Sequence, residues 1–230
     1  LAGPDGKAWL AGGVARVVLA DGQAIATSDK RYKVTVADHL GRCVVTGADA
    51  SGVLDWEIVV RPVDALSARI DLTITNRGKA PLTLERIEVL DAVLTGPADA
   101  DRNRVLVSGD NSWSGGRVGR LEKGGKPVES HYTLAVQSPQ LAAGFLAGRH
   151  NRDRFRLTAG QGGAGPRVLA WGECDKCLLP PGASRQADPL FVSGGDPLCG
   201  MELFADQAAK ENGVQLWPEN FATWCSWYAG

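Results

Sequence analysis

Short stretches in which apolar and polar side chains alternate fill most of the chain between Val14 and Val192. In the clearest stretch, from Leu66 to Thr75, every even-numbered residue is apolar and every odd-numbered residue is polar. Alternation with a period of two places the apolar side chains on one face of a β-strand and the polar ones on the other. The pattern therefore predicts antiparallel sheets that bury one face and expose the other to water.

Similar alternation predicts further strands around Trp56, Leu134 and Phe155, and long amphipathic helices do not interrupt the series. Glycine contributes 29 residues, and its clusters between the alternating stretches are typical of turns and loops. Many strands with short connections indicate a sandwich of two sheets, whereas βαβ folds need a helix between successive strands. We therefore expect an all-β, antiparallel sandwich.

Two local features are predicted after the clearest strand. The segment 76–79, Asn-Arg-Gly-Lys, is typical of a hairpin connection with a glycine available for a positive φ. The apolar phase then moves from the even position Leu84 to the odd position Ile87 without a turn residue between them. Such a shift predicts a β-bulge near Glu85 and Arg86.

The pattern changes once, near Asp196, where a helix is expected. Asp196 is a good N-cap, Pro197 suits the first helical turn, and Asn212 with the glycine after it is a stop signal. The apolar residues expected on one helical face are Leu198, Met201, Ala205 and Ala208. One helix after many strands predicts a boundary, with a sandwich domain at 1–195 and a helical linker at 196–220.

Charge and hydropathy argue against two classes of partner. Twenty-five basic and 26 acidic side chains leave a net charge of -1 without long runs of either sign, so a nucleic-acid partner is not expected. No apolar stretch approaches the roughly 18 residues that a membrane span needs, so a membrane partner is not expected either. The odd number of cysteines, five, favours reduced thiols and a cytoplasmic location. Because the chain opens with Leu1 rather than Met, a removed signal peptide stays open as the alternative.

Metal and cofactor chemistry has little support in the sequence. Cys174 and Cys177 have the spacing of zinc and redox motifs, but a structural zinc site needs a second ligand pair, and none follows. The three histidines, His39, His131 and His150, fall in different expected strands or loops without metal-ligand spacing. We therefore expect no bound metal and no cofactor.

The tail carries the most specific string, Trp-Cys-Ser-Trp-Tyr at 224–228. It resembles the first barrel strand of the family 36 glycoside hydrolases, the α-galactosidases and raffinose-synthase-like enzymes, where a Trp-x-Ser-Trp element opens the (β/α)₈ catalytic domain. Two earlier segments are similar to parts of that family's front domain: Gly-Asp-Asn-Ser-Trp-Ser at 109–114, and Glu-Cys-Asp followed by Leu-Pro-Pro-Gly within 173–182. The pieces occur in the family's order, although Thr223 stands where the family usually has glycine.

The resemblance implies an architecture and a function. The fold would be an antiparallel β-supersandwich of the galactose mutarotase-like type, followed by the linker helix and, at 221–230, the first strand of a truncated barrel. The function would be that of the non-catalytic N-terminal domain of an α-galactosidase-like enzyme. Such a domain would help to shape the active-site mouth and to form homo-oligomers. Its implied partners are an α-galactoside-type carbohydrate and the missing (β/α)₈ domain.

The same resemblance points to the substrate-binding residues. Trp227 matches the position whose indole forms part of the sugar-binding wall in relatives, and flat aromatic rings pack well against a pyranose. Trp224 beside it, and Trp113 with Asp110 in the earlier loop, are the further candidates. The alternatives are that Trp224 and Trp227 are core residues of an incomplete strand, that Trp113 folds back over the sandwich, and that Asp110 only stabilises its turn.

No catalytic residue is assigned. Retaining glycoside hydrolysis needs two carboxyl groups about 5–5.5 Å apart, and in a barrel enzyme these project from barrel strands. The ten residues from Phe221 to the end include neither Asp nor Glu, so this chain alone is expected to be inactive. Two alternatives remain: a stand-alone mutarotase-like epimerase, with His131 or His150 as the acid and a carboxylate as the base, and a carbohydrate-binding module.

Overall fold

The computed structural model describes residues 1, 8–28, 32–39, 41–49, 52–96, 103–109, 115–147, 152–160 and 165–215, with the backbone alone for 32–39 and 49. Within these ranges the chain forms sixteen strands and one helix. The strands are β1 (Leu10–Leu19), β2 (Ala24–Ala26), β3 (Tyr32–His39), β4 (Arg42–Asp49), β5 (Leu54–Pro62), β6 (Ser67–Asn76), β7 (Leu82–Leu94), β8 (Arg104–Val107), β9 (Arg117–Arg120), β10 (Val128–His131), β11 (Thr133–Val136), β12 (Leu141–Phe145), β13 (Asp153–Thr158), β14 (Arg167–Leu179), β15 (Ser184–Gln186) and β16 (Leu190–Ser193). The helix is α1 (Pro197–Glu211).

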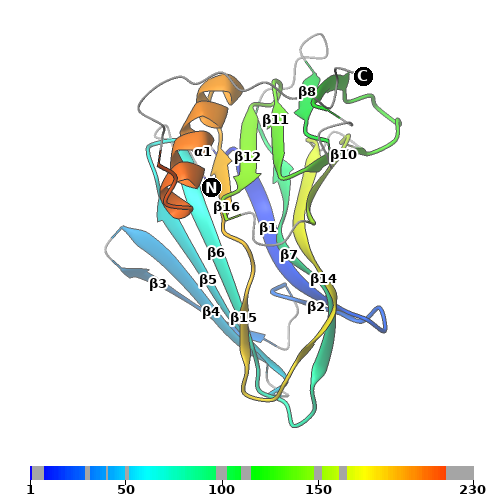
Figure 1. Cartoon of the computed structure of the whole chain (residues 1–230), viewed down its shortest axis with the longest axis vertical. Helices are drawn as coiled ribbons and strands as arrows, with labels where there is room; N and C mark the ends of the chain where they lie inside the picture. The colour runs from blue at the N-terminus through cyan, green and yellow to red at the C-terminus, as the bar shows by residue number, and fades with distance from the viewer. Residues whose placement is uncertain are drawn as a thin grey trace, which may run out of the picture.

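The strands form two antiparallel sheets (Figure 1). The smaller, six-stranded sheet has the order β10-β13-β14-β7-β1-β2. The large, ten-stranded sheet has the order β3-β4-β5-β6-β16-β12-β11-β8-β9, and β15 pairs with β6 beside this path. The predicted all-β, antiparallel supersandwich is therefore confirmed.

The core lies between the two sheets and follows the predicted alternation. On β6, Ile70, Leu72 and Ile74 are at most 5 % exposed, and they belong to one cluster with Ile87 of β7 and Phe155 of β13 from the other sheet. Burial of a large aliphatic or aromatic side chain stabilises a fold by about 1.5–3 kcal/mol. The period-two pattern thus builds the interface that holds the sheets together.

The predicted β-bulge lies where the sequence placed it. Val18 of β1 is opposite Arg86 of β7, whereas the next residue of β1, Leu19, is opposite Leu84. Glu85 is therefore the extra residue of the pair. The bulge lets both Leu84 and Ile87 point into the core despite their opposite parity, which explains the phase shift.

The predicted hairpin at 76–79 is wrong. β6 belongs to the large sheet and β7 to the six-stranded sheet, so this segment carries the chain from one layer to the other. The side chain of Asn76 organises the crossing: its Oδ1 accepts from Gly78 N at 2.9 Å, and its Nδ2 donates to the carbonyl oxygens of Ala80 and Leu179, both at 2.9 Å. The turn residues at 76–79 therefore predicted correctly that the chain turns there, but they carry no information about which sheet the next strand joins.

Helix α1 begins and ends as expected. The carboxylate of Asp196 accepts from Leu198 N at 2.9 Å and from Cys199 N at 3.1 Å, which satisfies two of the free amides of the first turn. Asn212 follows the last helical residue, and its side chain donates to Leu146 O at 2.8 Å. Within the described ranges the chain has no helix that combines the length and the apolar character needed to cross a membrane.

The prediction of which face of this helix is buried is wrong, however. Leu198 is 68 % exposed and Ala205 is exposed as well. The buried face is built around Gly200 and Phe204, which lie against β12 and β16 of the large sheet (Figure 1). The sequence pattern assigned the buried face to residues with apolar side chains. Close contact between the helix and the sheet instead requires glycine at position 200, because a side chain there would not fit.

Candidate functional site

The residues named as substrate-binding candidates cannot be placed. Trp227, Trp224, Trp113 and Asp110 all lie outside the described residues, as does the expected barrel strand at 221–230. Their roles stay predictions.

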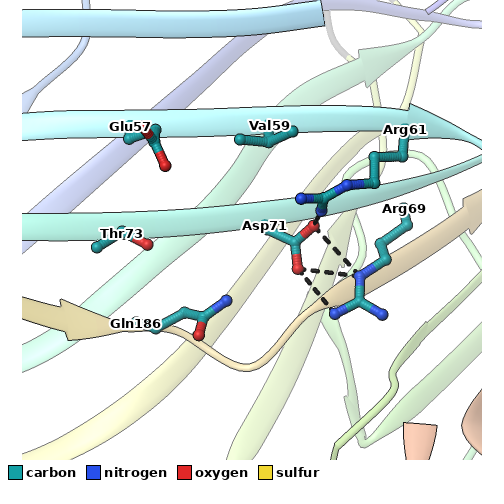
Figure 2. Close-up of a pocket in the computed structure, with 7 residues that line it drawn as sticks. All are labelled: Glu57, Val59, Arg61, Arg69, Asp71, Thr73 and Gln186. Atoms are coloured by element: carbon teal, nitrogen blue, oxygen red, sulfur yellow. Dashed lines mark hydrogen bonds and ion pairs between the residues drawn. The ribbon is translucent and has the colours of Figure 1, made fainter. Parts of the chain in front are cut away.

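The outer face of the large sheet has a polar trough beside helix α1. Because side chains alternate along a strand, the odd-numbered residues of β5 and β6 point away from the core. The trough is lined by Glu57, Val59, Arg61, Arg69, Asp71, Thr73 and Gln186 and encloses about 370 Å³ (Figure 2). An adjoining depression of about 390 Å³ shares Glu57 and Thr73 and continues the trough towards Asp55 and Arg77.

Asp71 is the centre of this trough. Figure 2 shows the guanidinium groups of Arg61 from β5 and of Arg69 from β6 converging on its carboxylate. Arg69 Nε donates to Asp71 Oδ1 at 2.9 Å, and its Nη1 donates to Glu211 of α1 at 2.6 Å. Asp71 is 5 % exposed, and a carboxylate that buried needs partners of opposite charge. The cluster thus joins the sheet to the last residue of the helix.

The chemistry open to the trough is recognition rather than acid–base catalysis. The carboxylate of Asp71 is engaged by the guanidinium groups of Arg61 and Arg69, so its oxygens are already bonded within the protein. The remaining lining offers hydrogen-bond donors and acceptors of both kinds, from Glu57, Thr73 and Gln186. This mixture suits a polyhydroxylated ligand.

A tryptophan on the outer face of the six-stranded sheet is not free to stack on a sugar. Trp171 of β14 is 6 % exposed, and the guanidinium groups of Arg156 and Arg86 lie 5.5 Å and 6.0 Å from its ring centroid. Its Nε1 donates to Glu173 at 2.6 Å. The two cation–π contacts cover the ring and make it part of the sheet's surface structure.

A second group of charges on that face surrounds Asp91. Burial alone would raise the pKa of the Asp91 carboxyl, but hydrogen bonds from Arg167 and Arg16 lower it below the ordinary value. Arg16 also donates to Glu88 at 2.8 Å. The group is a network of paired ions, and its arginines favour the ionised form of Asp91.

His131, the histidine of the epimerase alternative that the structure describes, faces a cation. Its Nδ1 lies 2.5 Å from Nη1 of Arg154 on the neighbouring strand. An acid–base pair for sugar epimerisation needs a carboxylate near the histidine. His150, the second histidine of that alternative, lies outside the described residues.

An unusual polar contact among the described interior residues joins Asp153 of β13 to Asp188, which precedes β16. Asp153 is fully buried and Asp188 is 3 % exposed. Burial, together with the charge and hydrogen bond of Asp188, raises the pKa of the Asp153 carboxyl to about 8. The described residues offer no donor to either carboxylate oxygen of Asp153, so a proton held between the two acids is the arrangement that satisfies both.

An apolar cavity of about 360 Å³ lies between the sheets, lined by aliphatic side chains that include Val45, Ile58 and Ile70. Leu1 and Thr27 also line this cavity. In the described part of the chain, no group of three or more His, Cys, Asp and Glu side chains has an arrangement suited to a metal ion.

Solved structures with a similar fold include two α-galactosidases and an α-N-acetylgalactosaminidase. The GH36 α-galactosidase AgaA from Geobacillus stearothermophilus, in complex with raffinose, is 15 % identical with a TM-score of 0.56, and the match covers 86 % of this chain and 32 % of that one. The α-galactosidase from Lactobacillus brevis is 14 % identical with a TM-score of 0.57, covering 86 % and 31 %. The α-N-acetylgalactosaminidase NagBb from Bifidobacterium bifidum, in complex with GalNAc, is 11 % identical with a TM-score of 0.55, covering 85 % and 33 %.

No protein-family model matches the sequence, and no curated protein matches it. The chain spans about a third of the length of the α-galactosidases that share its fold. The structural resemblance expected from the sequence motifs is thus confirmed at the level of the fold.

None of the trough residues was predicted from the sequence as a candidate for a functional site. The polar face of β6 was expected to be wet, yet Asp71 on that face is buried. The positions of the charged residues could have indicated the cluster, because Arg61, Arg69 and Asp71 all fall on outward positions of neighbouring strands. Their convergence depends on the pairing register, which puts Arg61 opposite Arg69 and could not be obtained from either strand alone.

Proposed function

We propose that this chain is the non-catalytic, N-terminal β-supersandwich domain of an α-galactosidase-like glycoside hydrolase, with the catalytic carboxylates in a different part of the full protein. The observation that carries the proposal is the shared fold: more than four fifths of this chain matches less than one third of each α-galactosidase. The whole enzyme would hydrolyse α-galactosides with retention, and its substrate would be an α-galactoside-type carbohydrate. Trp227, Trp224, Trp113 and Asp110 keep their proposed places near that substrate.

Within this proposal, helix α1 is the element that orients the next domain. Its last residue, Glu211, is bonded to Arg69 on the large sheet, and Asn212 is bonded to the carbonyl oxygen of Leu146. Gly200 brings the helix close to Ala142. A helix held at both ends of its contact surface is a rigid starting point for the chain that follows it, and would help to shape the active-site mouth.

The experiment that tests the proposal compares this chain with a longer product of the same reading frame. The expected result is that the 230 residues do not release nitrophenol from an aryl α-galactoside, whereas a product extended through a barrel domain does so. Hydrolysis by the 230 residues alone would contradict the proposal. Acceleration of galactose mutarotation, lost in His131→Ala, would favour the epimerase instead.

Saccharide binding without catalysis is the second candidate, and the polar trough favours it. Arg61, Gln186 and Thr73 offer donors and acceptors at spacings along a sheet face, where a sugar's hydroxyl groups can meet them. Titration with galactose, melibiose and raffinose, followed by tryptophan fluorescence, tests this. Binding that is lost in Gln186→Ala and kept in Ser184→Ala, a neighbour on β15 outside the trough lining, would support it; unchanged fluorescence would exclude it.

A further inference from the structure

Strand β14 loses its register with β7 between Cys174 and Cys177. Glu173 is opposite Arg86, and Cys177 is opposite Leu84, so three residues of β14 lie against the single residue Glu85. The bulge predicted from the β7 sequence therefore has a larger counterpart on the neighbouring strand. Cys174 is the first residue of this larger bulge, and Cys177 is the residue that follows it.

The backbone inside this bulge is unusual. Asp175 and Lys176 both have a positive φ, 49° and 57°, although neither is a glycine. Two successive left-handed residues turn the chain tightly, and in a turn of this kind the residues on either side have Cα atoms within about 7 Å. A disulfide joins Cα atoms about 4.4–6.8 Å apart. From this turn we infer that Cys174 and Cys177 lie within the range that a disulfide can span, and the interaction between their thiols agrees with it.

The two thiols differ in their surroundings. Cys174 is 6 % exposed, and its Sγ lies 3.9 Å from the carbonyl oxygen of Gly172. Burial raises the pKa of the Cys174 thiol to about 12; the guanidinium of Arg185 opposes this and the neighbouring Cys177 adds to it. Cys177 is half-buried and packs against the edge of the core, so it is the more accessible of the two thiols. The Cys174 thiol is thus protected by burial, and the Cys177 thiol is close enough to interact with it.

We propose that Cys177 is a thiol-modification site for small disulfides of the glutathione type, and that Cys174 is its resolving partner, so that the pair ends as a disulfide across the bulge of β14. The arrangement has a half-buried attacking thiol and a buried second thiol in a Cys-x-x-Cys spacing. It is independent of the proposed hydrolase function.

The reaction has two thiol–disulfide exchange steps. The thiolate of Cys177 attacks one sulfur of glutathione disulfide, forming a mixed disulfide and releasing one glutathione thiolate, which takes up a proton from water. The thiol of Cys174 then gives its proton to water and attacks the Cys177 sulfur, forming the internal disulfide and releasing the second glutathione. Two protein thiols are oxidised, and one glutathione disulfide is reduced to two molecules of glutathione.

The consequence for the fold is local. The internal disulfide closes the turn at Asp175 and Lys176 and fixes the point at which β14 changes register. Cross-linking restricts the unfolded chain, although a short loop gives less stabilisation than a long one. A small rise in melting temperature is therefore expected on oxidation, reversed by dithiothreitol.

The test uses the reduced full chain of 230 residues, incubated with glutathione disulfide, quenched in acid, and analysed by alkylation and peptide mass spectrometry. The expected product is a peptide containing residues 174 and 177 that is lighter by two hydrogen atoms and resistant to alkylation. Cys174→Ser is expected to stop at a stable mixed disulfide on Cys177. Cys177→Ser is expected to lose both products.

Cys199→Ser is the matched control, because Cys199 is an exposed thiol on the helix and far along the chain from the bulge. It should leave the cross-link unchanged. The proposal is overturned if the wild-type chain keeps both thiols of the pair open to alkylation, or if Cys177 is found linked to Cys43, Cys199 or Cys225. Because the wild-type result alone decides this, a variant that fails to fold does not affect the test.

Discussion

At the residue scale, the contact between Asp153 and Asp188 makes a prediction about pH. The pKa of the Asp153 carboxyl is about 8 in the folded protein, against an ordinary value near 3.8. Between these values the folded state holds one proton more than the unfolded state. The contribution of this contact to the free energy of unfolding is therefore fully present below about pH 4 and is lost progressively as the pH rises towards about 8.

The variant Asp153→Asn tests that account. An amide keeps the shape of the acid, cannot ionise, and supplies a permanent donor to Asp188. We expect the variant to be more stable than the wild type at pH 8 to 9, by on the order of a few kcal/mol, with the difference shrinking towards pH 4. Urea unfolding followed by circular dichroism across this range measures it, with Asp206→Asn on the exposed face of α1 as the control. Parallel pH profiles for wild type and variant would rule out the shared proton.

The polar trough gives a second residue-scale prediction. Arg69→Gln removes a guanidinium that serves both the buried Asp71 and Glu211 of the helix. Leaving buried acids short of a partner costs about 1–3 kcal/mol. The matched change Arg77→Gln breaks the exposed pair with Asp55, and such pairs contribute about 0–1 kcal/mol. Equal losses of unfolding free energy in the two variants would show that the trough cluster is no more than a surface ion pair.

At the scale of elements, the docking of α1 depends on a glycine. A methyl group at Gly200 would lie 2.6 Å from Cβ of Ala142, which is closer than real contacts allow, and 3.3 Å from the side chain of Ser193, which is tighter than most real contacts. In an exposed helix, Gly→Ala stabilises by about 1 kcal/mol. Here we expect the sign to reverse, with a net loss of about 1–2 kcal/mol from overpacking.

Gly119→Ala on β9 is the control for that variant, since a methyl group there would meet no atom within 4 Å. Thermal unfolding compares the two variants. A Gly200→Ala protein that melts above the wild type would mean that the helix is not tightly seated on β12 and β16.

The elements themselves show what sequence patterns can and cannot predict. Alternation found β5 and β6, and the phase shift found the bulge at Glu85, because both depend on which side chains the local backbone buries. The crossing at Asn76 and the buried face of α1 were misjudged, because both depend on the partner surface. The turn residues and apolar side chains near them carry no information about that partner.

At the scale of the whole molecule, the two-layer architecture was predictable from period-two alternation alone, and the resemblance of the motifs to the α-galactosidases agrees with the fold. The trough could not be predicted, because it arises from the register of β5 against β6 and from a helix that follows them by well over a hundred residues. Long-range contacts of this kind are fixed by the fold rather than by any segment. Asp71 in the trough and Asp91 on the outer face of the six-stranded sheet are each bonded to two arginines.

The crystal structure of a longer product of the same reading frame, with an α-galactoside bound, tests the central claim most directly. The account predicts a sandwich unchanged from the one described, a separate (β/α)₈ barrel beginning after α1, and two carboxyl groups about 5–5.5 Å apart within that barrel. A structure in which the residues after α1 extend the edges of the sandwich, with the sugar bound between carboxylates of the sandwich itself, would contradict it.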